Sequence, residues 1–156
     1  MTSATDFKTT DGTGVVATSG QLATFRLDGD LYGIEVEHVQ EVLKSQGLTR
    51  VPLAPSAVAG LINLRGQVVT AIELRERLGR PPRPEGTDAV VIVVRLHGEA
   101  VSLLVDSIAD VVDVDAADFE APPDTLEGQA RDLIRGAYKL DGQLLLALDV
   151  QKAVSA

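Results

Sequence analysis

The chain has 156 residues, and 23 acidic against 14 basic side chains give it a net charge of −9. A nucleic-acid-binding protein normally carries a basic face, so this balance argues against nucleic acid and against an anionic membrane surface as partners. The chain has no cysteine, which excludes disulfides, thiolate nucleophiles and cysteine-ligated metals. The polar start and the short apolar runs predict neither a signal peptide nor a membrane span, and therefore a cytoplasmic protein.

The first elements are predicted from polarity and spacing. Residues 1–20 are rich in Thr, Ser, Gly and Asp and are interpreted as a mobile tail. Alternating apolar residues predict strands over 22–27 and 31–36, joined by a turn at 28–30. Apolar residues at helix-like spacing in 38–43 indicate a short helical turn that leads into a strand.

A hairpin is predicted over residues 60–74, where two runs of branched aliphatics flank Arg65 and Gly66. Gly66 can take the positive φ that a tight turn needs. This places Arg65, a long cation in an acidic protein, at or beside the tip. Most charged turn residues only solvate the turn, so this stretch alone leaves both a solvated and a functional arginine open.

The second half continues with short elements. A charged helix is predicted over 73–78, and the proline-rich segment 80–86 is interpreted as a linker and an internal boundary. The unbroken apolar run at 89–94 is typical of a strand buried on both faces. Residues 106–132 carry nine acids and one base, and are interpreted as a solvated loop with fragments of strand and helix. A hairpin over 138–148 and a helix over 150–154, capped by Asp149, complete the chain.

An internal duplication organises these elements. Residues 25–42 align with 94–111, and residues 60–74 align with 136–150. The offsets differ by seven residues, so the second copy has an insertion in its acidic segment. A copy of about 65 residues holds too little apolar surface for a robust isolated core. The sequence therefore predicts two similar small β-barrels, pseudo-symmetric and packed together, with a groove between them.

The residues that could carry catalysis do not converge in the sequence. His38 and His97 are the only histidines and stand at near-equivalent turns of different copies, so they are predicted to be surface residues far apart. A metal site is therefore not expected, since zinc needs three or four converging ligands. The acids of 113–120 lack the glycine and the final acid of a calcium loop. We expect no catalytic residue and no cofactor, and predict a protein that acts by binding.

Several stretches together resemble the CheW family of bacterial chemotaxis coupling proteins. The resemblance rests on the motifs at 32–36, 39–42, 60–66, 90–93 and 105–111, and covers nearly the whole chain. It implies an all-β fold of two five-stranded SH3-like barrels with short helical segments. It also implies a non-enzymatic adaptor that joins the histidine kinase CheA to chemoreceptor cytoplasmic tips in membrane-associated arrays.

The resemblance also implies roles for five residues. By this resemblance, Val39 and Glu41 correspond to residues of a kinase-binding site. Arg65 and Asn63 correspond to residues of a motif needed for coupling and receptor binding. Val90 resembles part of the apolar groove between the barrels that takes a receptor helix tip. A purely structural interpretation stays open beside each role, with Val39 and Val90 as plain core and Glu41 as a solvated edge charge.

The predicted organisation is one CheW-like domain made of two contiguous barrels, at residues 21–84 and 85–149. The C-terminal helix in 150–156 is expected to pack on the first barrel. The expected partners are the regulatory domain of a CheA-type kinase, a chemoreceptor tip and further CheW copies, without nucleic acid or membrane insertion. The alternatives are a small-ligand-binding barrel that acts as a sensor, a coupler of a non-flagellar chemosensory pathway, and a hydrolase that uses scattered carboxylates.

Overall fold

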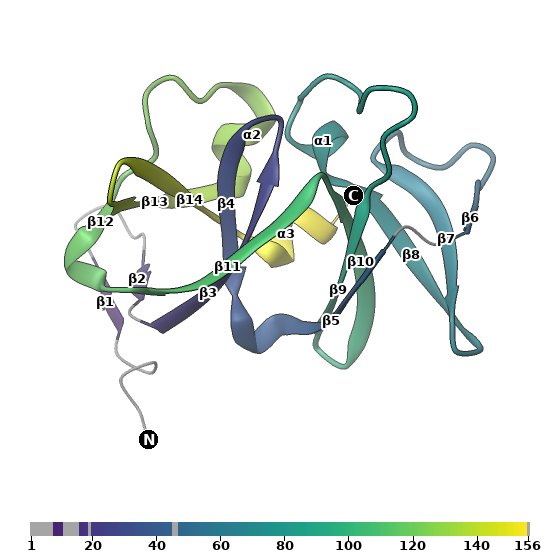
Figure 1. Ribbon diagram of the computed structural model, residues 1–156, viewed down its shortest axis with the longest axis horizontal. Helices are drawn as coiled ribbons and strands as arrows, with labels where there is room; N and C mark the ends of the chain where they lie inside the picture. The colour runs from purple at the N-terminus through teal and green to yellow at the C-terminus, as the bar shows by residue number, and fades with distance from the viewer. Residues whose placement is uncertain (1–7, 11–15, 19, 45–46, 156) are drawn as a thin grey trace.

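The computed structural model describes residues 8–10, 16–18, 20–44 and 47–155. Two six-stranded sheets lie side by side (Figure 1). The first sheet has the order β11 (Ser107–Val114), β3 (Gly20–Leu27), β4 (Asp30–Glu35), β14 (Gln143–Leu148), β13 (Ile134–Leu140), β12 (Phe119–Glu120). The second sheet has the order β5 (Val39–Lys44), β9 (Val90–Leu96), β10 (Glu99–Val105), β8 (Gln67–Glu73), β7 (Val58–Leu64), β6 (Leu48–Thr49). The predicted all-β class is confirmed, and a two-residue strand extends each predicted set of five.

The helices are short, and all of them except α3, which follows the last strand, lie between strands in the chain. They are η2 (Val36–His38), α1 (Leu74–Arg77), η3 (Ala116–Asp118), α2 (Gly128–Leu133) and α3 (Val150–Val154). The side chains of Glu73 and Asp149 cap α1 and α3 by accepting bonds from the backbone N–H groups of Arg75 and Lys152. The predicted helices over 73–78 and 150–154 are therefore confirmed.

The N-terminal segment contains a small sheet. Strands β1 (Lys8–Thr10) and β2 (Val16–Thr18) pair antiparallel. Gly20, the last residue of the predicted mobile tail, begins β3, and residues 1–7, 11–15 and 19 lie outside the described residues.

One local prediction was wrong and one is confirmed with shifted bounds. The acidic segment, interpreted as a loop with fragments of strand and helix, begins with a full strand, β11, because its apolar positions pair with β3 in the register Ile108 to Phe25 and Val112 to Leu22. Pairing with a distant strand outweighs the local sequence pattern there. The predicted helical turn that leads into a strand is present as η2 followed by β5, slightly earlier in the chain than predicted.

The internal duplication is confirmed by the strand registers. Val39 faces Val94 across β5 and β9, and their counterparts Ile108 and Phe25 face each other across β11 and β3. The hairpins β7–β8 and β13–β14 both contain a register shift next to a glycine at corresponding positions, 60 and 136.

The predicted boundary between two contiguous barrels was wrong. Strands β8 and β10 lie on either side of the 80–86 linker, yet they pair in parallel within the second sheet. Likewise β4 pairs in parallel with β14 in the first sheet. The first sheet thus takes residues 20–35 and 107–148, and the second takes residues 39–105. The chain exchanges strands because β3–β4 and β9–β10 are local hairpins, whereas the strand after each hairpin crosses to the other sheet.

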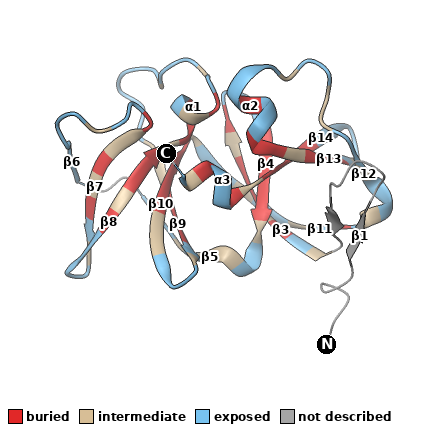
Figure 2. Cartoon of the chain, turned by 180° about the vertical axis from the view of Figure 1, so that it is seen from behind, coloured by how far each residue is buried: buried red, intermediate tan, exposed pale blue. Residues whose placement is uncertain are grey.

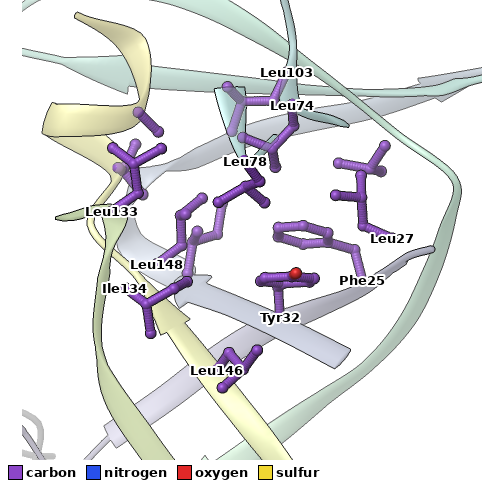
Figure 3. Packing of buried hydrophobic residues seen from close by; sticks show 14 of the residues in the cluster. Phe25, Leu27, Tyr32, Leu74, Leu78, Leu103, Leu133, Ile134, Leu146 and Leu148 are labelled. Atoms are coloured by element: carbon purple, nitrogen blue, oxygen red, sulfur yellow. The ribbon is translucent and has the colours of Figure 1, made fainter. Parts of the chain in front are cut away.

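The largest core lies between the two sheets (Figure 2). Phe25 and Tyr32 of the first sheet stack with ring centroids 5.8 Å apart, close to Leu74 of α1 and Leu103 of the second sheet (Figure 3). Each barrel interior holds a smaller separate cluster. The middle of the predicted groove is therefore a packed core, because the apolar faces of both sheets bury each other there. Helix α3 packs into this shared core through Val150 and Ala153, not onto one barrel alone.

Candidate functional site: the Glu41–Arg65 pair

Arg65 stands at the tip of the β7–β8 hairpin, as predicted. Arg65 and Gly66 form a two-residue turn with φ of 51° and 86°, the pattern of a type I′ turn. The Asn63 Oδ1 atom accepts a hydrogen bond from the Gly66 backbone N–H at 2.9 Å. Asn63 therefore braces the turn. A non-glycine residue seldom adopts this left-handed conformation, so the fold holds Arg65 in an uncommon geometry.

The structure joins Arg65 to Glu41 in a bidentate ion pair. Arg65 Nη1 donates to Glu41 Oε2 at 2.7 Å, and Nη2 donates to Oε1 at 2.8 Å. Strands β9 and β10 separate β5 from the β7–β8 hairpin in the sheet order. The pair can form only because the sheet curls, and it links one edge strand to the hairpin tip across the barrel.

The pair is a fixed charge arrangement on the surface. The hydrogen bonds from Arg65 lower the pKa of Glu41, and those to Glu41 raise the pKa of Arg65. Both groups are thus ionised at neutral pH. The Arg65 side chain is 76% exposed whereas that of Glu41 is 19% exposed, so the guanidinium group is the part that a partner meets first.

The other two predicted site residues are half-buried. Val39 and Val90 both pack against the central core. The outward-facing apolar side chains nearby are Val42, one residue after Glu41, and Val68, which faces Asn63 near the hairpin tip. The sequence analysis missed both of them. Alternation along β5 would have singled out Val42, if 39–44 had been interpreted as a strand throughout.

The prediction that the two histidines lie far apart was wrong. His38, at the end of η2, and His97, in the β9–β10 turn, line the same cleft of about 330 Å³. The crossing of the chain between the sheets brings the two copies together there. Possible ligand atoms of Glu35, Glu37 and His38 lie within 4.8 Å of one another. The expectation of no metal site stays a prediction.

A partly buried ionic network was also missed. Arg75, which is 7% exposed, donates to both carboxylate oxygens of Asp106, from Nε at 2.9 Å and Nη2 at 2.6 Å. The backbone N–H of Asp28 donates to Asp106 Oδ2 at 2.8 Å. Burial opposes ionisation, but the bonds from Arg75 and Asp28 and the charge of Arg83 lower the pKa of Asp106 to about 2. Since 31 residues separate Arg75 and Asp106, no local sequence signal connects them.

The comparisons with known proteins agree with this geometry. The family model described as a CheW-like domain matches residues 21–156. The chain belongs to the CheW-like family. It is 31% identical over 140 residues to the chemotaxis protein CheW of Treponema pallidum (strain Nichols), covering 87% of this chain and 82% of the relative. It is 30% identical over 137 residues to CheW of Bacillus subtilis (strain 168), covering 88% of each.

A solved structure supports the fold assignment of this CheW-like chain. The crystal structure of the scaffolding protein TtCheW from Thermoanaerobacter tengcongensis superposes with a TM-score of 0.74 at 29% identity. The similarity covers 85% of this chain and 90% of that one. The two curled sheets are thus the paired SH3-like barrels of this family. Among the described residues, no helix is long and apolar enough to cross a membrane.

Proposed function

We propose that this CheW-like chain is a non-enzymatic chemotaxis adaptor that couples chemoreceptor cytoplasmic tips to a CheA-type histidine kinase. It would be recruited from the cytoplasm to membrane-associated receptor arrays. The family match and the relatives named as chemotaxis proteins support the adaptor role. The observation that carries the proposed site is the bidentate Glu41–Arg65 pair on an exposed hairpin tip.

The pair suggests that kinase binding and receptor coupling share one site. Glu41 was expected to face the kinase and Arg65 the receptor, but each fixes the position of the other. A partner that contacts the Arg65 guanidinium group therefore also perturbs Glu41. The exposed Val42 and Val68 add apolar surface to the two elements that carry the pair. Charged and apolar side chains on the same elements can give both affinity and orientation in a protein interface.

The adaptor role is tested by calorimetric titration of the purified chain with the regulatory domain of the CheA-type kinase. Absence of binding at about 50 μM of each protein would contradict the adaptor role. That outcome would favour the alternative function of a ligand-binding sensor. If the proteins bind, the cellular behaviour that the kinase controls in living cells distinguishes a flagellar pathway from another chemosensory pathway.

The site is tested with variants that keep the turn. Asn tolerates the left-handed backbone, so Arg65→Asn removes the ion pair without disturbing the hairpin. We expect weaker kinase binding and lost coupling for Arg65→Asn and for Glu41→Lys. Asp141→Asn, at the corresponding exposed turn of the second copy, is the matched control. Equal affinity of all three variants and the native chain would place the interface elsewhere.

A further inference from the structure

The chain crosses between the two sheets twice, and the internal duplication relates the two crossings. The first crossing is η2, between β4 and β5, and the second is Asp106, between β10 and β11. The register just after each crossing is the same, since Val39 faces Val94 and Ile108 faces Phe25. The two crossings can therefore be compared residue by residue.

At the second crossing, the linker of the chain itself binds beside the crossover and leaves a cavity of about 350 Å³ lined by Glu73 and Arg83. Arg83 donates to both oxygens of Glu73, at 2.7 and 3.2 Å, and to Asp106 Oδ1 at 3.1 Å. Arg75 Nη1 donates to the carbonyl oxygen of Pro81 at 2.8 Å. An extended, proline-containing segment thus lies beside this crossing, and its arginine bridges two carboxylates.

At the first crossing, the corresponding space is an open cleft of about 330 Å³. Asp149 and Gln151 line it, and by the duplication they correspond to Glu73 and Arg75. Asp149 caps α3 as Glu73 caps α1, so the two carboxylates occupy like positions. Gln151 is exposed, and its amide can donate to a peptide carbonyl as the Arg75 guanidinium group does at the other crossing.

The carboxylates that hold an arginine at the second crossing have counterparts at the first. By the duplication Glu37 stands in the place of Asp106. Glu35 and Asp149 line the cleft, and a ligand atom of Glu37 lies within 4.8 Å of those of Glu35 and His38, which are both lining residues. Neighbouring like charges disfavour one another, and a guanidinium group can bridge two carboxylates with paired hydrogen bonds.

The basic groups of the cleft are already engaged. Arg95 donates from Nε to Gln40 Oε1 and from Nη1 to the Gly98 carbonyl oxygen, both at 2.8 Å. Arg135 Nη1 lies 3.7 Å from Glu35 Oε1. The two lining carboxylates, Glu35 and Asp149, thus balance the two guanidinium groups, and the acid that gives this region its excess of negative charge is Glu37 beside the cleft.

We propose that the cleft beside η2 binds an extended segment of a partner protein that carries an arginine. The arginine lies between Glu37 and Asp149, as Arg83 lies between Asp106 and Glu73, and Gln151 donates to a carbonyl of the segment. The linker at the second crossing is the template for this binding mode. The inference goes beyond the adaptor role and does not rest on it.

The test uses the linker as a free ligand. The probe is a synthetic peptide with the sequence of residues 79–86, titrated into the ¹⁵N-labelled full chain in the presence of EDTA and followed by NMR. We expect amide shifts at residues 35–38, 95–98 and 149–151, with a dissociation constant of about 1 mM or lower. A peptide with glutamate at the position of Arg83 is expected to bind about tenfold more weakly.

Variants separate the cleft from unspecific attraction of a cationic peptide to an acidic protein. Glu37 is exposed, so Glu37→Lys is expected to fold and to weaken peptide binding about tenfold. Asp113→Lys makes the same charge change on exposed β11 and should leave binding unchanged. Shifts outside the cleft, equal binding of the glutamate peptide, or equal effects of the two variants would each overturn the proposal.

Discussion

The two copies within this chain share their strand registers and differ in the charges at their turns. Arg65 and Glu41 pair in one copy, whereas the corresponding residues of the other copy, Asp141 and Asp110, are both acids and cannot form such a pair. The turn itself does not need the arginine, because the Asp28–Gly29 turn has the same left-handed φ pair. The comparison teaches that the paired apolar residues and the turn glycines, which both copies share, are what each barrel needs to fold. The Glu41–Arg65 pair, which only one copy has, gives that copy a different surface.

The largest expected effect is on the shared framework. A Cβ atom at Gly60 would lie 2.3 Å from the Thr49 carbonyl oxygen, and one at Gly136 would lie 2.5 Å from that of Glu120. The strands β6 and β12 cross the hairpins closely at these points. Gly60→Ala and Gly136→Ala should each lower the free energy of unfolding by about 3 kcal/mol, measured by urea denaturation.

The control for this prediction is Gly47→Ala. No atom lies within 4 Å of a Cβ at Gly47, so that variant should unfold like the native chain. If only one of the two close-contact glycines proves sensitive, the two barrels are not equivalent in their packing.

A smaller effect is expected at the crossing where the linker binds. Folding lowers the pKa of Asp106 from its ordinary 3.8 to about 2, so its contribution is present above pH 4 and is lost as the pH falls through 2. The contribution is about 2 kcal/mol at pH 7. Asp106→Asn should therefore lower the free energy of unfolding by about 2 kcal/mol at pH 7. Between pH 4 and pH 2 the free energy of unfolding of this variant should decrease less than that of the native chain.

The measurement is chemical denaturation as a function of pH, with Glu37→Gln as the counterpart at the first crossing. That variant should leave stability nearly unchanged, since Glu37 is exposed. Equal losses of stability for both variants would contradict the distinction between the crossing whose carboxylate is bound by Arg75 and Arg83 and the crossing without such arginines.

The smallest effect on folding is expected for an exchange of turn residues between the copies. Arg65→Asp combined with Asp141→Arg keeps two-residue turns in both hairpins, because aspartate also tolerates the left-handed conformation. The thermal unfolding midpoint should shift little, while kinase binding is lost and is not restored by the arginine in the other barrel. A large fall in the midpoint would show that the Glu41–Arg65 pair is a structural clamp.

Much of the fold could be predicted because its signals are local. The turn at Arg65 and Gly66, the caps Glu73 and Asp149, and the strand at 89–94 each depend on a few neighbouring residues. The duplication also follows from the sequence, since corresponding apolar positions occupy corresponding registers. The individual site residues were named from the family resemblance alone. The structure brings two of them together, Glu41 on β5 and Arg65 on the β7–β8 hairpin.

The sequence by itself determined the class of fold, the family, the duplicated strands and the turn that presents Arg65. Only the tertiary structure decided that strands are exchanged between the sheets, that Arg65 meets Glu41 and that Arg83 binds two carboxylates at one crossing. The physical reason is range: turn and strand preferences act between neighbouring residues, whereas these contacts join residues 10 to 31 positions apart through the curl and crossing of the sheets.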